Sequence, residues 1–252
     1  MPLILPPVTP QRALLWLINW QTFKTPLTLT MEERVRAESI HHPTSQARYV
    51  KSRAILRQIL SHYLQQDPDA IQLIAPPNQK PRLQHNPDKF AFNVAHSGDW
   101  VWIGLCQNAE IGVDLESAQR EFNVQALAKK LKMPAENPLA VLSAFSAREA
   151  ILKCSGQGLR QFQFPDPNIQ AQLAMAEGLI LAVALGAAVD ISTISAETPR
   201  FSAIRCSHTS MYAALGFSKI KSFHLDIANC QQPLDKKIET VCVTHELSWS
   251  KT

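Results

Sequence analysis

The chain has few of the segments that mark membrane, secreted or disulfide-rich proteins. Its longest strongly apolar run, residues 179–189, is interrupted by Gly186 and is too short to span a bilayer. The five cysteines are an odd number without a Cys-x-x-Cys spacing, which argues against a disulfide framework and against a zinc site. Residues 1–7 lack the basic and apolar regions of a secretory signal. We therefore expect a cytoplasmic protein with reduced thiols and no membrane contact.

Several common motifs of catalysis and nucleotide binding are also missing. The sequence contains no P-loop, no complete GxGxxG, no HExxH, no GxSxG and no obvious Cys–His pair. Candidate functional residues therefore have to be found from the spacing of charged side chains.

The bulk composition is that of a globular protein. The chain has 252 residues, of which 46% are hydrophobic and 18% charged, enough for one large domain or two of modest size. The net charge of +4 favours anionic partners only mildly.

Apolar periodicity and capping residues predict an α+β fold. The apolar run at 13–20 predicts a buried strand. Thr30 followed by Glu33 is a capping box, which predicts a helix from Met31, and a second helix is expected at 47–64. Further along, the patterns predict a loop at 76–89, a hairpin at 90–107 turning at Gly98 and Asp99, helices at 122–133 and 138–154, and mostly strands from 162 to about 217.

A weak internal repeat suggests how these elements are grouped. Residues 49–57 align with 145–153, and residues 95–100 align with 207–212, in the same helix-then-strand order. We infer two similar α+β halves related by pseudo-twofold symmetry. Ligands often bind at the junction between two such halves. The expected units are residues 1–112, residues 113–228 and a polar, loosely ordered tail at 229–252.

Two short strings could bring three carboxylates and a cation together. In the predicted strand 111–116, alternation places Asp114 and Glu116 on one face. In the predicted helix that contains Glu149 and Lys153, these residues are four apart and share a face. If the strand packs on the helix, the group suits Mg²⁺ holding a phosphate ester. The alternative is that they form only a polar strand face and a surface ion pair.

Other polar residues have the chemistry to bind phosphate. Arg48, Arg53 and Arg57 are expected to form a basic helix surface, and the planar guanidinium binds two phosphate oxygens. That surface could instead be solvated or contact nucleic acid. The low net charge and the lack of a visible aromatic stacking surface argue against a nucleic-acid partner. His96 and Ser97 follow an apolar stretch and could donate to a phosphate.

Three blocks taken together resemble the signature of the 4′-phosphopantetheinyl transferases. The blocks are Asn93–Ser97, Ile111–Glu116 and Phe145–Leu159. Their order and spacing are similar to the large, pseudo-dimeric type, which acts on carrier proteins of peptide, polyketide and fatty-acid synthases. The resemblance covers about residues 30–220.

The resemblance implies an activity, a cofactor and partners. A member of this family transfers 4′-phosphopantetheine from coenzyme A to a serine of an acyl or peptidyl carrier protein and releases 3′,5′-ADP, with Mg²⁺ as cofactor. A covalent pseudo-dimer is expected to be a monomer. The pathway, whether fatty-acid, polyunsaturated-lipid, polyketide or siderophore synthesis, stays open.

The resemblance also implies a role for individual residues. It assigns Asp114, Glu116 and Glu149 to Mg²⁺, Lys153 to the diphosphate of coenzyme A, Arg48 and His96 to its 3′-phosphate, Lys80 and Pro81 to the nucleotide, and Ser97 to a position near the phosphates. Glu149, Glu136 or a metal-bound water would take the proton of the attacking serine. The segment around 120–135, with its basic strip at 129–133, would receive the carrier protein.

Two residues depart from the family pattern. Phe145 stands where the family has Trp, and Arg148 stands where it has Lys. Arginine keeps the charge but cannot shuttle a proton, so Arg148 is expected to pair charges only. These departures support an alternative of another class, a non-catalytic protein of the same fold that binds coenzyme A or a nucleotide.

Overall fold

The computed structural model describes residues 13–24, 26–75, 79–156, 169, 171–176, 178–187, 205–206, 220–226 and 238–243. The helices among them are α1 (Met31–Glu38), α2 (Pro43–Leu64), α3 (Val124–Leu131) and α4 (Pro138–Ser155). The strands are β1 (Ala13–Asn19), β2 (Leu73–Ile74), β3 (Arg82–Leu83), β4 (Phe90–Ser97), β5 (Trp100–Gln107), β6 (Ala109–Ser117), β7 (Ala171–Ala176), β8 (Leu179–Ala187), β9 (Arg205–Cys206), β10 (Ile220–Asp226) and β11 (Ile238–Val243).

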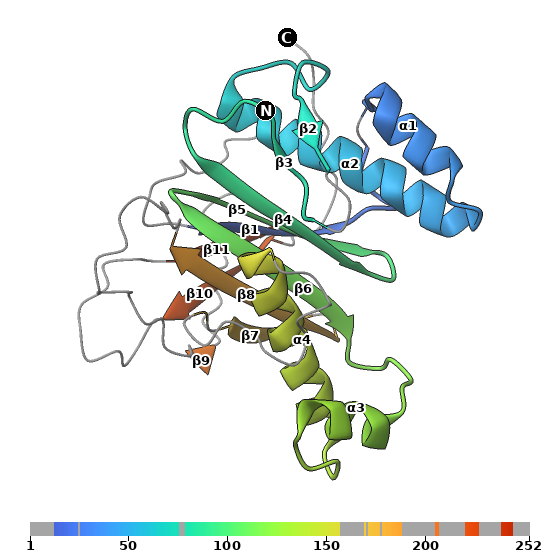
Figure 1. Ribbon diagram of the computed structural model, residues 1–252, viewed down its shortest axis with the longest axis vertical. Coiled ribbons are helices and arrows are strands. Elements are labelled where there is room, and N and C mark those ends of the chain that lie inside the picture. The colour runs from blue at the N-terminus through green and yellow to red at the C-terminus, as the bar shows by residue number, and fades with distance from the viewer. Residues whose placement is uncertain are drawn as a thin grey trace.

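Two sheets lie face to face at the centre of the protein (Figure 1). Six of the described strands form one sheet in the order β4-β5-β1-β11-β10-β9, and β6-β8-β7 form the other. The apolar run of β1 is buried on both faces, because alternate residues point to opposite sides. Leu14 and Trp16 join a core with α2, whereas Leu15 and Leu17 join a core with β6 and β8.

Helix α4 covers the outer face of the smaller sheet. Ala150 and Cys154 of α4 pack against Ala182 and Ala184 of β8. The order of layers is therefore helices α1 and α2, the larger sheet, the smaller sheet, and α4 (Figure 1). This mixed arrangement agrees with the predicted α+β class, while the pseudo-twofold relation of two halves stays a prediction.

Most segments with a clear sequence pattern form the expected elements. The strand at 13–19, the capping box at Thr30 and the hairpin of β4 and β5 are confirmed. Helix α2 begins at Pro43 rather than at Ala47, because proline is well tolerated at the first position of a helix. Residues 207–212 of the proposed repeat lie outside the described residues.

Six residues of the expected tail form a strand. Residues 238–243 form β11, which runs parallel to β1 in the middle of the larger sheet, with Leu14 opposite Glu239. Apolar residues such as Val241 and Val243 suit a strand, and the polar composition of the surrounding sequence hid this pattern. The other residues of 229–252 lie outside the described part.

Arg57 does not belong to a basic surface, so this prediction is corrected. The Arg57 side chain, which extends from α2, is fully buried. Arg57 Nε donates to Glu33 Oε2 of α1 at 2.9 Å, and Nη1 donates to the carbonyls of Pro68 and Ile71 at 2.7 and 2.8 Å. These partners satisfy a charge that would otherwise be too costly to bury, so Arg57 ties α1 and the 68–71 segment to α2.

Within the described residues, no helix combines the length and the apolar character that crossing a membrane requires.

Candidate active site

The site is built where α4 crosses β6. Gly112 of β6 lies against the backbone of α4 so closely that a Cβ there would meet the Ala150 carbonyl oxygen at 2.0 Å and the Cys154 amide nitrogen at 2.3 Å. Only glycine permits this approach. Because Glu149 and Lys153 each precede one of these two residues, the same contact brings their side chains toward Asp114.

Asp114 is the buried centre of this group, with 6% of its surface exposed. Its Oδ1 accepts from Lys153 Nζ at 2.6 Å, and its Oδ2 accepts from Ser146 Oγ at 2.8 Å. Both donors come from α4, so the predicted packing of the strand on the helix is confirmed.

Glu116 lies two residues further along the same strand and is half-buried. Its carboxylate forms an ion pair with Arg120, whose guanidinium also lies over the ring of Phe145, 5.8 Å from the centroid. The Phe145 ring thus supports the cation that neutralises Glu116, a contact that needs an aromatic face and no indole N–H. Burial raises the pKa of Glu116, and the hydrogen bond and charge of Arg120 oppose this rise.

Glu149 is the member of the group whose charge is least compensated. It is 8% exposed, and its Oε1 is buried without a hydrogen-bond partner. Burial raises its pKa most; the charge of Asp114 also raises it, while Lys153 and Lys130 lower it. An acidic side chain in this state can accept a proton or a cation.

The three carboxylates offer the hard oxygen donors that Mg²⁺ prefers. The unpartnered Oε1 of Glu149 fits a cation ligand, and burial is the main cause of the raised pKa values of Glu116 and Glu149. As the side chains stand, no group of three or more His, Cys, Asp or Glu residues in the described part of the chain is arranged to hold a metal ion. Lys153 occupies one oxygen of Asp114, so a bound cation would have to displace or share that contact.

His96 of β4 is affected by the charges of Asp114 and Lys153 and by that of Arg48 of α2. Desolvation lowers the pKa of His96 most, the charges of Arg48 and Lys153 lower it further, and Asp114 raises it. His96, Tyr49, Arg53 and Pro81 are among the residues that line a cavity of about 130 Å³. The imidazole of His96 is therefore within electrostatic reach of Asp114 and Lys153 and lines a cavity together with Arg53.

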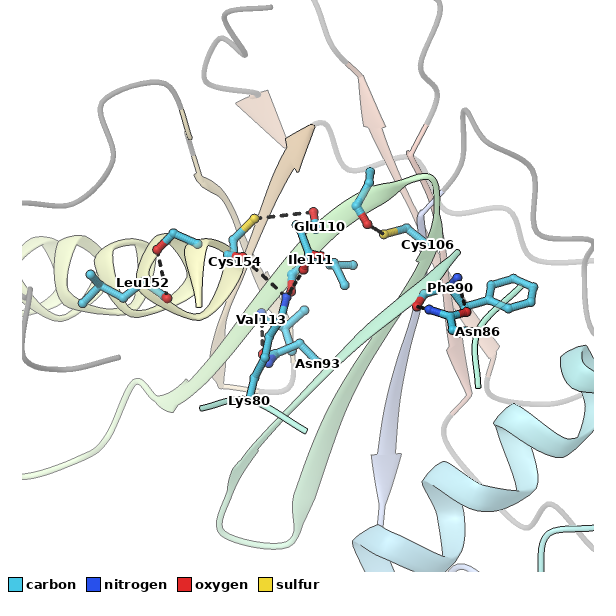
Figure 2. Close-up of polar contacts among 12 residues, drawn as sticks. Lys80, Asn86, Phe90, Asn93, Cys106, Glu110, Ile111, Val113, Leu152 and Cys154 are labelled. Atoms are coloured by element: carbon cyan, nitrogen blue, oxygen red, sulfur yellow. Dashed lines mark hydrogen bonds and ion pairs between the residues drawn. The ribbon is translucent and has the colours of Figure 1, made fainter. Parts of the chain in front are cut away.

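The Lys80 side chain lies where β6 packs against α4 (Figure 2). It forms an ion pair with Glu110, and its Nζ lies 3.4 Å from the carbonyl oxygens of Ile111 and Cys154. Lys80 and Pro81 also line a larger cavity of about 760 Å³. Lys80 thus contacts both β6 and α4.

Of the remaining predicted residues, Glu136 lies apart from this group, and Ser97 follows His96 at the end of β4. Glu136 is exposed and precedes Asn137, the N-cap of α4, with about 18 Å of helix between Asn137 and Glu149 at 1.5 Å per residue. Ser97 ends β4 beside the hairpin turn, opposite Trp100. The structure does not bring Glu136 to the carboxylates.

Three residues of the site were not predicted from the sequence. Ser146 and Arg120 bond to Asp114 and Glu116, and the charge of Lys130 acts on Glu149. Arg120 is four residues after Glu116, and this spacing is a signal only in a helix, whereas here a strand ends between them. Lys130 was expected only to receive a carrier protein.

Comparison with known proteins identifies the relatives of this chain. A family model for the N-terminal part of 4′-phosphopantetheinyl transferases matches residues 16–108. A putative 4′-phosphopantetheinyl transferase of Synechocystis is 34% identical in an alignment of 156 positions that covers 56% of this chain and 63% of the relative. The matched parts of this chain are therefore similar to 4′-phosphopantetheinyl transferases.

Two further 4′-phosphopantetheinyl transferases are similar to this chain. The 4′-phosphopantetheinyl transferase HetI of Nostoc is 28% identical over 54% of this chain and 63% of its own length. The 4′-phosphopantetheinyl transferase psf-1 of Bacillus pumilus is 29% identical over 52% and 59%. The matched part thus spans about three fifths of the length of these relatives. The family model covers Arg48, Lys80 and His96 but ends before β6.

Replacing Glu149 by glutamine is expected to stabilise the protein at high pH. The folded pKa of Glu149 lies above its ordinary 4.5, so its contribution to stability is present below pH 4.5 and is lost as the pH rises through the folded pKa. Each unit of that difference is worth about 1.4 kcal/mol. Without divalent cations, Glu149→Gln should therefore melt above wild type at pH 8, and the gap should close toward pH 4.5.

Glu121→Gln, at an exposed glutamate after β6, is the control for this comparison. Thermal melts in EDTA across the pH range give the answer. Added Mg²⁺ should raise the melting temperature of wild type more than that of Glu149→Gln. Parallel curves for the two proteins at every pH would show that Glu149 carries no unfavourable charge.

Proposed function

We propose that this protein transfers 4′-phosphopantetheine from coenzyme A to a serine of an acyl or peptidyl carrier protein and releases 3′,5′-ADP. The observation that carries the proposal is the joint site of β6 and α4, where Asp114, Lys153 and Glu149 meet beside His96. The similarity to 4′-phosphopantetheinyl transferases favours this chemistry over a non-catalytic binding role.

The carboxylates are the proposed Mg²⁺ ligands. Asp114, Glu116 and Glu149 would hold the ion, which when bound neutralises the diphosphate of coenzyme A and orients the phosphorus. Ser146 would orient Asp114 through its hydrogen bond. Lys153 would then be free to stabilise the charge on the transferred phosphoryl group.

The remaining basic residues would hold the nucleotide. Arg48 supplies a planar fork for the 3′-phosphate, and His96, whose pKa is lowered, would donate from a neutral imidazole. Lys80 and Pro81 would contact the nucleotide from the cavities that they line. These groups would fix the distance between the reacting phosphorus and the serine oxygen. Holding two reacting atoms at the right distance accelerates their reaction.

Glu149 is the proposed proton acceptor among the side chains. The serine oxygen forms a bond to the β-phosphorus, the bond from that phosphorus to the leaving 3′,5′-ADP breaks, and the serine proton goes to a base. A carboxylate with a raised pKa accepts a proton more readily than an ordinary one. Glu136 lies at the other end of α4, which makes it the less suitable candidate.

The carrier protein is proposed to bind near α3. Lys129 and Lys132 are exposed there, and the helix, which contacts α4, buries Ala128. Carrier proteins are acidic around their serine, so a basic surface next to the site suits them. A monomeric state and a cytoplasmic location remain predictions from the sequence.

The test is direct transfer to a panel of carrier domains. Purified protein, coenzyme A and Mg²⁺ are incubated with acyl and peptidyl carrier domains, and intact mass is measured, with serine-to-alanine carriers as controls. We expect one phosphopantetheine per reactive carrier and no transfer in excess EDTA. Binding of coenzyme A without modification of any carrier, under conditions where a known transferase works, would support the non-catalytic alternative instead.

A further inference from the structure

β4 and β6 lie side by side although they belong to different sheets (Figure 1). A side chain of β4, and not a main-chain group, accepts a hydrogen bond from the main chain of β6. Asn93 of β4, 6% exposed, accepts from the Val113 amide of β6 through its Oδ1 at 2.9 Å (Figure 2). This bond spans the two sheets.

The bond satisfies the edge of β6 that faces away from its own sheet. Val113 lies opposite Val183 of β8, and because its N–H points to Asn93, this pair is one whose main-chain groups point outward. Ile111, two residues earlier, points the same way, and its carbonyl lies 3.4 Å from Lys80 Nζ. The side chains of Asn93 and Lys80 therefore both contact this edge of β6.

The position of Asn93 connects the two parts of the site. Val113 immediately precedes Asp114 on β6, and Asn93 lies three residues before His96 on β4. Apolar packing between the sheets has no strong direction along the strands, whereas a hydrogen bond fixes distance and angle.

We infer that Asn93 is a positioning residue for the proposed transfer: its amide oxygen fixes β6 on β4 and so sets Asp114 relative to His96. The kinetic part of this inference rests on the proposed function, while the hydrogen bond can be tested without it. Without the acceptor, the nucleotide-binding groups on β4 and α2 keep their places, but the carboxylates of β6 lose their fixed position relative to them.

Three variants test the inference. Asn93→Leu keeps the size and removes the acceptor, and Asn93→Asp is isosteric and keeps it. Asn86→Leu is the matched control, because the Asn86 side chain bonds to the Phe90 amide and carbonyl, at 2.8 and 2.7 Å, at the start of β4 and not to β6. Amide hydrogen exchange at Val113, kcat and the KM for coenzyme A are measured for each.

The expected pattern separates positioning from general stability. In Asn93→Leu, exchange at Val113 should rise about tenfold or more, because its hydrogen bond is lost. The kcat should fall about tenfold or more, with the KM for coenzyme A within about threefold. Asn93→Asp should restore protection at Val113, and Asn86→Leu should match wild type in exchange and kcat.

Other results would overturn the inference. Wild-type exchange at Val113 in Asn93→Leu, or an equal fall of kcat in Asn86→Leu, would show that Asn93 does not fix β6. If Asn93→Leu does not fold, Asn93→Ser takes its place, since its hydroxyl is too short to reach Val113. If wild type transfers nothing, the proposed function fails, and the exchange comparison still decides whether Asn93 fixes β6.

Discussion

Gly112→Ala should lower the transfer activity at least about 100-fold, because a shift of only 1 Å in a catalytic group can cost that much. The new Cβ would lie 2.0 Å from the Ala150 carbonyl oxygen and 2.3 Å from the Cys154 amide nitrogen. Both atoms belong to the backbone of α4, which cannot rotate away as a side chain can. The helix must therefore move off β6, and it takes Glu149 and Lys153 with it.

The same substitution should also destabilise the protein. Overpacking a well-filled interior typically costs about 1–3 kcal/mol. The matched control is Gly186→Ala on β8, which also faces α4. There the new Cβ would meet Cys154 Sγ at 3.2 Å, so a small movement of one side chain can accommodate it.

Intact-mass transfer assays and thermal melts of both glycine variants provide the measurement. Gly186→Ala should keep most of the activity of wild type. A Gly112→Ala protein that transfers at half the wild-type rate or better would show that α4 does not need its present contact with β6.

Arg57→Met should reduce the free energy of unfolding by about 3–5 kcal/mol, the cost of removing one partner of a buried ion pair. The substitution leaves the Glu33 carboxylate buried without its cation and leaves the carbonyls of Pro68 and Ile71 without their donor. The loss should be independent of coenzyme A, since Arg57 is enclosed in the core.

The double variant Arg57→Met with Glu33→Gln separates the charge from the other contacts. Removing both charges should recover about 1–2 kcal/mol, because an isolated buried charge no longer remains. Full recovery is not expected, since Glu33 Oε2 also accepts from the Thr30 amide in the capping box of α1. Exposed Arg36→Met is the control and should stay within about 0.5 kcal/mol of wild type.

Urea denaturation of the four proteins gives these free energies. An Arg57→Met variant within 1 kcal/mol of wild type would contradict the view that Arg57 ties α1 to α2.

Local sequence patterns predicted the helices and strands that are specified by residues close together in the sequence. The apolar run of β1, the capping box at Thr30 and the alternation around Asp114 each specify their structure through neighbours a few residues apart. The meeting of Asp114 with Lys153 was predicted as well, because strand and helix periodicities placed both residues on defined faces.

Long-range contacts were beyond the reach of these patterns. The sequence around Arg57 predicts an exposed basic stripe, and only the packing of α1 and the 68–71 segment buries it. The bond from Asn93 to Val113 joins strands of different sheets, for which no spacing rule exists. The pairing of β11 with β1 likewise links opposite ends of the described chain.

Asp114 belongs both to the proposed cation site and to an ion pair with Lys153. Asp114 is bonded to Lys153 and Ser146, so it serves either as a ligand for Mg²⁺ or as the partner of a structural ion pair. The two roles differ in how the transfer rate responds to the concentration of magnesium.

The decisive measurement is a magnesium titration of the transfer rate for wild type, Asp114→Asn and the exposed control Glu121→Gln, read by the intact mass of the carrier. Asparagine keeps the shape of the side chain and its bond to Ser146 but removes the charge. We predict that Asp114→Asn needs about 10–100-fold more Mg²⁺ for half-maximal rate, as metal sites lose when a supporting group is changed, while Glu121→Gln follows wild type. Identical magnesium curves for Asp114→Asn and wild type would contradict a cation site shared by β6 and α4.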